Sequence, residues 1–195
     1  MRTLGGLLVV LVVCVCSALA SQWQDRIDLS HFLTDDAALN TLTIAYWPTY
    51  RQVLYVYGSG KLIAQSYPGL SFSQQYGLFP TCKAALSPEK VRDVVRLIIQ
   101  VRFFDLPQKS FVYATASDDI EDAEKEWQVH SIALDDGNIH AQRDFAAGTY
   151  LGKQESIPQE FAAVEASLQR LRKETLKDTP CKLDYYVRPP SVDRR

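Results

Sequence analysis

The stretch Gly58-Ser59-Gly60-Lys61 is the first in this chain whose residue types could do chemistry, because a glycine-rich turn before lysine can bind phosphate. A phosphate-binding loop also needs an earlier glycine, where Tyr55 stands, and a serine or threonine after the lysine, where Leu62 stands. The residues before the stretch are β-branched and aromatic, and those after it are extended in character. We therefore predict a β-hairpin that turns at Ser59-Gly60 with a positive φ, and no phosphate site.

Two serine motifs resemble those of serine enzymes, and each lacks a required partner. Ser87-Pro88-Glu89-Lys90 has the S-x-x-K spacing of penicillin-recognising enzymes, but no K-T-G sequence follows it. The stretch Gly69-Leu70-Ser71-Phe72-Ser73 lacks the final glycine of a nucleophile elbow. A helix N-cap followed by proline at the first helical position accounts for Ser87 and Pro88. The sequence predicts no catalytic residue and no cofactor.

The three histidines, His31, His130 and His140, are the candidate metal ligands or acid–base groups. A two-residue turn at Asp136-Gly137 would pair His130 with Arg143 and place His140 on the opposite face of the sheet. A register shifted by one residue would bring both imidazoles to one face, although a third metal ligand would still be missing. We predict exposed strand histidines and no metal site, with an acid–base or metal site as the alternative.

A run of carboxylates suggests either a solvated loop or a weak cation site: Asp118, Asp119, Glu121, Asp122, Glu124 and Glu126. The run lacks the D-x-D-x-D-G arrangement that folds carboxylates around one ion. We predict a solvated loop, with low-affinity cation binding as the alternative.

Five aromatic residues that lie close together in the sequence form a candidate contact surface: Tyr46, Trp47, Tyr50, Tyr55 and Tyr57. Aromatic rings can supply contact area on a surface, or they can pack inside a half-buried strand. The sequence leaves both interpretations open.

Residues 1–20 have the features of an export signal. Arg2 is followed by an apolar run over residues 7–16 and by a small-residue cleavage pattern that ends at Ala20. The run of about ten residues is shorter than the roughly 20 needed to span a bilayer. We predict cleavage after Ala20 and a secreted or periplasmic location, with no later membrane span. An uncleaved anchor and a lipidated leader cysteine are the alternatives.

Composition limits the function classes. The chain has 21 basic and 23 acidic residues and a net charge of −2, which predicts no nucleic-acid-binding surface. Removal of the leader leaves about 175 residues, enough for one domain with a core of its own. It also leaves two cysteines, Cys82 and Cys181, without C-x-x-C spacing. In an oxidising compartment such a pair predicts one disulfide, with two buried thiols as the alternative.

The elements expected to position these residues are short strands and two amphipathic helices. Helices are expected to begin at Pro88 and near Pro158, and strands to span residues 41–47, 53–57, 62–66, 110–115, 127–134 and 139–145. Residues 67–86 are expected to form a long loop. This βββα-βββα order predicts an α+β fold, with a mainly antiparallel sheet and both helices on one face. Residues 40–176 would form a single domain, between an N-terminal extension (21–39) and a C-terminal tail (177–195).

Three motifs resemble a family of exported bacterial domains of unknown function. They are the hairpin over residues 56–62, the helix start Leu86-Ser87-Pro88-Glu89, and Phe103-Phe104-Asp105-Leu106-Pro107. The resemblance covers roughly residues 40–175. It implies export and a single α+β domain, and it brings no known activity or catalytic residue.

The sequence thus favours a secreted or periplasmic domain that acts by binding a protein or a cell-envelope ligand. A small hydrolase with an unrecognised site and a low-affinity cation-binding envelope protein are the alternatives. The two main classes differ in what they require. Binding requires an apolar or aromatic patch, whereas catalysis requires polar groups with shifted pKa values that converge in a concave site.

Overall fold

The computed structural model describes residues 27–49, 52–66, 78–108, 127–150 and 153–185. Within these ranges, eight strands form one antiparallel sheet in the order β7-β6-β5-β1-β2-β3-β4-β8. The predicted α+β class with a mainly antiparallel sheet is confirmed. The strands are β1 (Thr43–Thr49), β2 (Gln52–Tyr57), β3 (Lys61–Ser66), β4 (Leu78–Ala85), β5 (Trp127–Asp135), β6 (His140–Tyr150), β7 (Lys153–Glu155) and β8 (Lys182–Tyr185).

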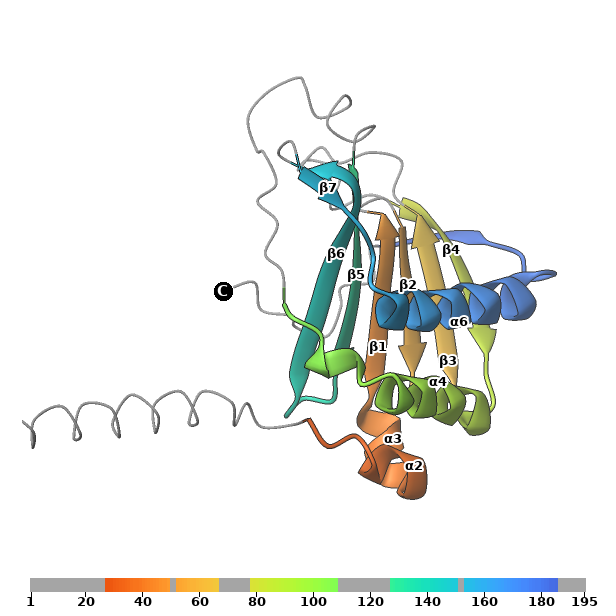
Figure 1. Ribbon diagram of the computed structural model, residues 1–195. Coiled ribbons are helices and arrows are strands. Elements are labelled where there is room, and N and C mark those ends of the chain that lie inside the picture. Colours follow the sequence, from red (N-terminus) through yellow and green to blue (C-terminus); the bar gives the residue numbers. More distant parts are fainter. Residues whose placement is uncertain (1–26, 50–51, 67–77, 109–126, 151–152, 186–195) are drawn as a thin grey trace, which may run out of the picture.

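The helices of the described ranges are α2 (His31–Thr34), α3 (Asp36–Thr41), α4 (Pro88–Gln100), the 3-10 turn η2 (Phe103–Asp105) and α6 (Gln159–Leu176). Figure 1 shows α4 and α6 lying across the same face of the sheet, as predicted. We call this face the helix side. Each of the two long helices buries an apolar stripe against the sheet: Val91, Val94, Val95 and Ile98 in α4, and Phe161, Val164, Leu168 and Leu171 in α6.

The glycine-rich stretch forms the β2–β3 hairpin, which confirms the prediction of a turn. The loop holds three residues rather than two, and the Gly60 N–H donates to the carbonyl of Tyr57 at 2.9 Å. Gly60 has a φ of 83°, a conformation that favours glycine. A Cβ atom on Gly58 would lie 1.5 Å from the carbonyl oxygen of Leu39, so this glycine lets α3 approach the turn. Strand β3 follows at Lys61, so the residues after the turn do not form the helix that a phosphate-binding loop requires.

Helix α4 begins as the sequence predicts. The Ser87 hydroxyl accepts a hydrogen bond from the backbone N–H of Lys90 at 3.4 Å, and Pro88 is the first helical residue. The S-x-x-K spacing is therefore part of a helix N-terminus, in which the serine caps the first turn.

Three parts of the chain differ from the prediction. The expected loop 67–86 contains β4, so four strands rather than three precede α4. The expected tail contains β8, which pairs with β4. The expected N-terminal extension contributes Leu29, Phe32 and Leu39 to the main core. The strand expected at residues 110–115 lies outside the described residues and stays a prediction. In addition, β7 lies between β6 and α6, where the sequence predicts no strand.

Candidate functional site

The predicted aromatic contact surface is divided between the two faces of the sheet. Tyr46 points to the helix side and is buried in the main core. Trp47, Tyr55 and Tyr57 lie on the opposite side, where the Trp47 and Tyr55 rings meet edge to face at 6.4 Å. Tyr55 is fully buried, so among the described members of the predicted surface only Trp47 and Tyr57 offer accessible ring surface. Tyr50 lies outside the described residues.

A buried carboxylate on the helix side brings Tyr46 together with His130. Glu165 of α6 accepts a hydrogen bond from the Tyr46 hydroxyl at 2.6 Å, and its Oε1 lies 2.5 Å from Nδ1 of His130 on β5. Gln169 lies one helical turn later and donates its Nε2–H to the Tyr46 hydroxyl at 2.8 Å. We call Tyr46, His130, Glu165 and Gln169 the Glu165 cluster. The cluster joins α6 to β1 and β5 through side chains alone.

The electrostatics of the Glu165 cluster define its protonation. Burial raises the pKa of the Glu165 carboxyl, but hydrogen bonds from His130 and Tyr46 outweigh burial and hold this pKa below its ordinary value. Burial and the hydrogen bond to Glu165 together raise the pKa of the Tyr46 phenol. At neutral pH, Glu165 is thus an ionised acceptor and Tyr46 a protonated donor. Because Nδ1 of His130 faces Oε1 of Glu165, the imidazole turns its Nε2 away from the carboxylate.

A carboxylate can orient a histidine as a general base in this way, but the Glu165 cluster lacks the other parts of such a site. Catalytic pairs of this kind act on a nucleophile within hydrogen-bond reach of the imidazole. In the part of the chain that the structure describes, Nε2 of His130 has no hydrogen-bonded side chain. Nor do these ranges hold three or more His, Cys, Asp or Glu side chains placed to bind a metal ion. The arrangement fixes α6 on the sheet.

His130 and His140 lie on the predicted faces of the sheet, but only one of them is as exposed as predicted. The β5–β6 hairpin turns over four residues, so His130 is opposite Phe145 rather than Arg143. This register is two residues from the predicted one, and each imidazole keeps its predicted face because side chains alternate with a period of two. The prediction of an exposed side chain is wrong for His130, which is 15 % exposed. It is confirmed for His140, which is 52 % exposed.

Sequence reasoning missed Glu165 altogether. The signal was present, because this residue lies four positions after Phe161 and one after Val164, on the apolar stripe of the last helix. A carboxylate on a stripe that packs against a sheet requires hydrogen-bond donors from that sheet. Tyr46 and His130 supply those donors.

The most exposed apolar side chains gather at the β4–β8 edge. Leu78 pairs with Tyr185 and Pro80 pairs with Leu183 across the two strands, so the four side chains form one block. The exposed fractions are 52 % for Leu78, 65 % for Leu183 and 70 % for Tyr185. Leu78 and Pro80 flank buried Phe79 along β4, and Phe79 lies on the opposite side of the sheet. Because side chains alternate along a strand, the block lies on the helix side. We call Leu78, Pro80, Leu183 and Tyr185 the apolar edge patch.

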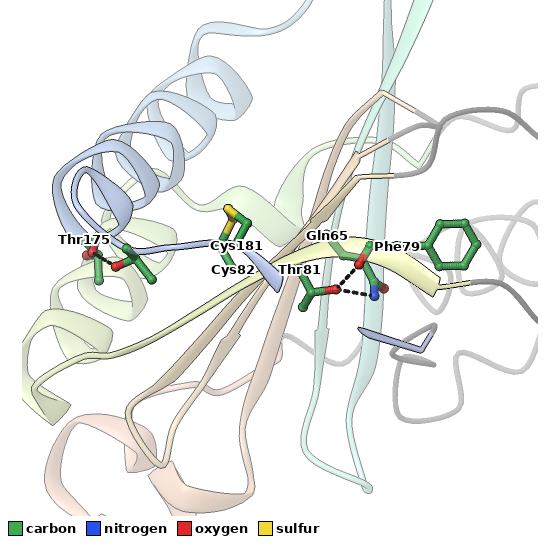
Figure 2. Close-up of a disulfide and its surroundings, with 7 residues drawn as sticks. Gln65, Phe79, Thr81, Cys82, Thr175 and Cys181 are labelled. Carbon is green, nitrogen blue, oxygen red and sulfur yellow. Dashed lines mark hydrogen bonds between the residues drawn. A yellow bond between two sulfur atoms is a disulfide. The ribbon is translucent and has the colours of Figure 1, made fainter. Parts of the chain in front are cut away.

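A disulfide holds this edge together, as predicted. Cys82 of β4 and Cys181, the residue before β8, are bonded with Cα atoms 4.2 Å apart and a sequence separation of 99. Figure 2 shows the disulfide on the side of β4 that faces α6, with Phe79 on the other side. The Nε2–H group of buried Gln65 donates to the hydroxyl of Thr81 at 2.8 Å and to the carbonyl of Tyr185 at 2.9 Å.

Several predicted features lie outside the described residues: the leader (1–20), the serine motif at Gly69–Ser73 and the acidic run from Asp118 to Glu126. Across the described ranges, none of the helices is both long enough and apolar enough to cross a membrane. Comparison with protein-family models, curated proteins and solved structures finds no match to this chain. The resemblance to exported bacterial domains therefore stays a prediction.

Proposed function

We propose that this chain is an extracytoplasmic interaction domain that binds a protein partner through the apolar edge patch. The observation that carries the proposal is the exposure of Leu78, Leu183 and Tyr185 side by side on two paired strands. Together with Pro80 they form one contiguous exposed apolar surface, and the largest such patch on a monomer is often functional.

The architecture around the patch suits binding. The Cys82–Cys181 disulfide fixes the start of β8 against β4, so the patch is held in place before a partner arrives. A preorganised surface loses less conformational entropy on binding. Structural disulfides persist in oxidising compartments, and this agrees with the export signal predicted from residues 1–20.

The competing interpretation as a hydrolase has weaker support. The Glu165 cluster contains the only carboxylate–imidazole pair on the helix side of the described residues, and its members bond to one another across the α6–sheet interface. The packing of α6 on the sheet accounts for the geometry of the Glu165 cluster. No such packing accounts for the exposure of Leu183 and Tyr185.

Site-specific photocross-linking tests the proposal. A benzophenone amino acid is placed at Leu78 in cells that export the chain, and at exposed Lys173 of α6 as the control position. We expect one discrete protein adduct from position 78 and none from position 173. The adduct should be lost with Tyr185→Asp and kept with Tyr185→Phe, because only the first change places a charge on the patch. Equal adducts at both positions, or an adduct that survives Tyr185→Asp, would overturn the proposal.

A further inference from the structure

The side of α6 that contacts the start of β2 carries an arginine, Arg172, that has no acidic partner among the described residues. Glu165, Gln169 and Arg172 follow one another at spacings of four and three residues, so they lie on one helical stripe. The first two belong to the Glu165 cluster. Arg172 donates from Nη1 to Oε1 of Gln52 at the start of β2, at 3.0 Å. Among the described residues, no carboxylate lies within ion-pair distance of this half-buried guanidinium.

Arg172 lies in line with the apolar edge patch. Gln52 is paired with Ser66 of β3, and Pro80 of β4 is paired with Leu183 of β8, so these residues fall on neighbouring strands on the helix side. Neighbouring strands are about 4.8 Å apart, so about 14 Å separates Gln52 from Leu183. Figure 1 shows that α6 crosses the strands and that the ends of β1, β3 and β4 extend past it. A line across those ends runs alongside α6 from the guanidinium to the patch.

We propose that the partner segment is an extended acidic–apolar peptide, whose carboxylate binds Arg172 while its apolar side chains cover the apolar edge patch. This inference rests on the proposed function and names the chemistry of the partner. An extended peptide advances about 3.3 Å per residue, so about four residues separate its carboxylate from its outermost apolar contact. Guanidinium and carboxylate form paired, charge-assisted hydrogen bonds, which supply the specificity that an apolar patch lacks.

The edge itself argues against recognition by strand addition. The backbone N–H of Tyr185 donates to the carboxylate of Asp184 at 2.8 Å, and its carbonyl accepts from Gln65. Both backbone groups of Tyr185 are thus already bonded, and β8 is only four residues long; short edge strands offer little to pair with another strand. Recognition therefore depends on side chains.

A peptide selection tests the inference. A displayed library of random heptapeptides is selected on the oxidised chain, on Arg172→Met and on Arg170→Met, the matched control on the exposed side of α6. We expect the unaltered chain and Arg170→Met to enrich peptides with Asp or Glu about four positions from Leu, Phe or Tyr. Selection on Arg172→Met should enrich the apolar residues without the acid.

A double-mutant cycle on one selected peptide gives the quantitative result. Replacing its acidic residue with the amide should weaken binding to the unaltered chain at least tenfold and leave binding to Arg172→Met unchanged. Selected peptides without an acidic preference, or an amide effect that persists in Arg172→Met, would overturn the inference. The photocross-link at position 78 would remain in that case, so failure here is distinguishable from failure of the proposed function.

Discussion

Replacing Glu165 with glutamine tests whether the Glu165 cluster holds α6 on the sheet. The carboxylate oxygen Oε1 accepts from the Tyr46 hydroxyl at 2.6 Å and faces Nδ1 of His130 at 2.5 Å. Glutamine keeps the shape and one acceptor oxygen but removes the negative charge. Both hydrogen bonds then lose their charged acceptor.

The expected loss follows from the strengths of the two kinds of bond. A hydrogen bond to a charged group contributes about 1.5–3 kcal/mol and a neutral one about 1 kcal/mol, so two weakened bonds lower the free energy of unfolding by about 2 kcal/mol. For a domain of this size, that corresponds to a fall in Tm of roughly 4–8 °C.

The loss should also depend on pH. Because the folded-state pKa of Glu165 is lowered, its carboxylate stabilises the fold above the unfolded pKa of about 4.3. This stabilisation is lost as the pH falls below that value and passes through the folded-state pKa. The difference between the unaltered chain and Glu165→Gln should be full at pH 7 and should close in stronger acid.

Urea unfolding followed by far-ultraviolet circular dichroism at pH 7, 5, 4 and 3 measures this difference. Glu174→Gln changes an exposed carboxylate on the same helix and should leave the free energy of unfolding within about 0.5 kcal/mol. Equal stability of the chain and Glu165→Gln at pH 7 would refute the reasoning, and so would a difference that is unchanged at pH 3.

Three further changes have definite expectations. Ser87→Ala should lower the free energy of unfolding by about 1 kcal/mol through loss of the helix cap, measured by urea unfolding, and it should leave binding intact. Gly58→Ala should destabilise by 2 kcal/mol or more (~2–4), because the new Cβ meets the Leu39 carbonyl; unchanged thermal unfolding would contradict this. Replacing Cys82 and Cys181 together with serine should accelerate amide hydrogen exchange in β8 and lower stability by at most ~4–5 kcal/mol. Exchange that stays slow throughout β8 would show that the bridge does not hold the edge.

The sequence predicted the elements whose apolar residues repeat with a clear period. Helix α4 has four buried residues at helical spacing and a capping serine, and β2 and β3 flank a glycine turn. β4 alternates between exposed and buried residues, but Pro80 and Lys83 make this alternation resemble a loop. β8 has four residues and too little length for any period, so its pairing with β4 is a purely tertiary outcome.

The candidate sites were harder to predict because they combine distant residues. Leu78 and Tyr185 are unremarkable in their own segments and become a patch only when β8 pairs with β4. Tyr46 and His130 were identified as residues of interest, but their partner Glu165 is supplied by a helix that follows both strands in the sequence. The faces of the two strand histidines were predictable, since a register shift by two residues preserves them.

The pairing of β4 with β8 also determines when the apolar edge patch forms. Leu183 and Tyr185 supply half of the patch, and the bonding partner of Cys82 lies 99 residues later in the sequence. During synthesis from the N-terminus, β1–β3, β4 and α4 emerge well before that partner does. The apolar edge patch is therefore among the last parts of the fold to be completed, because a chain that is still emerging lacks Leu183 and Tyr185.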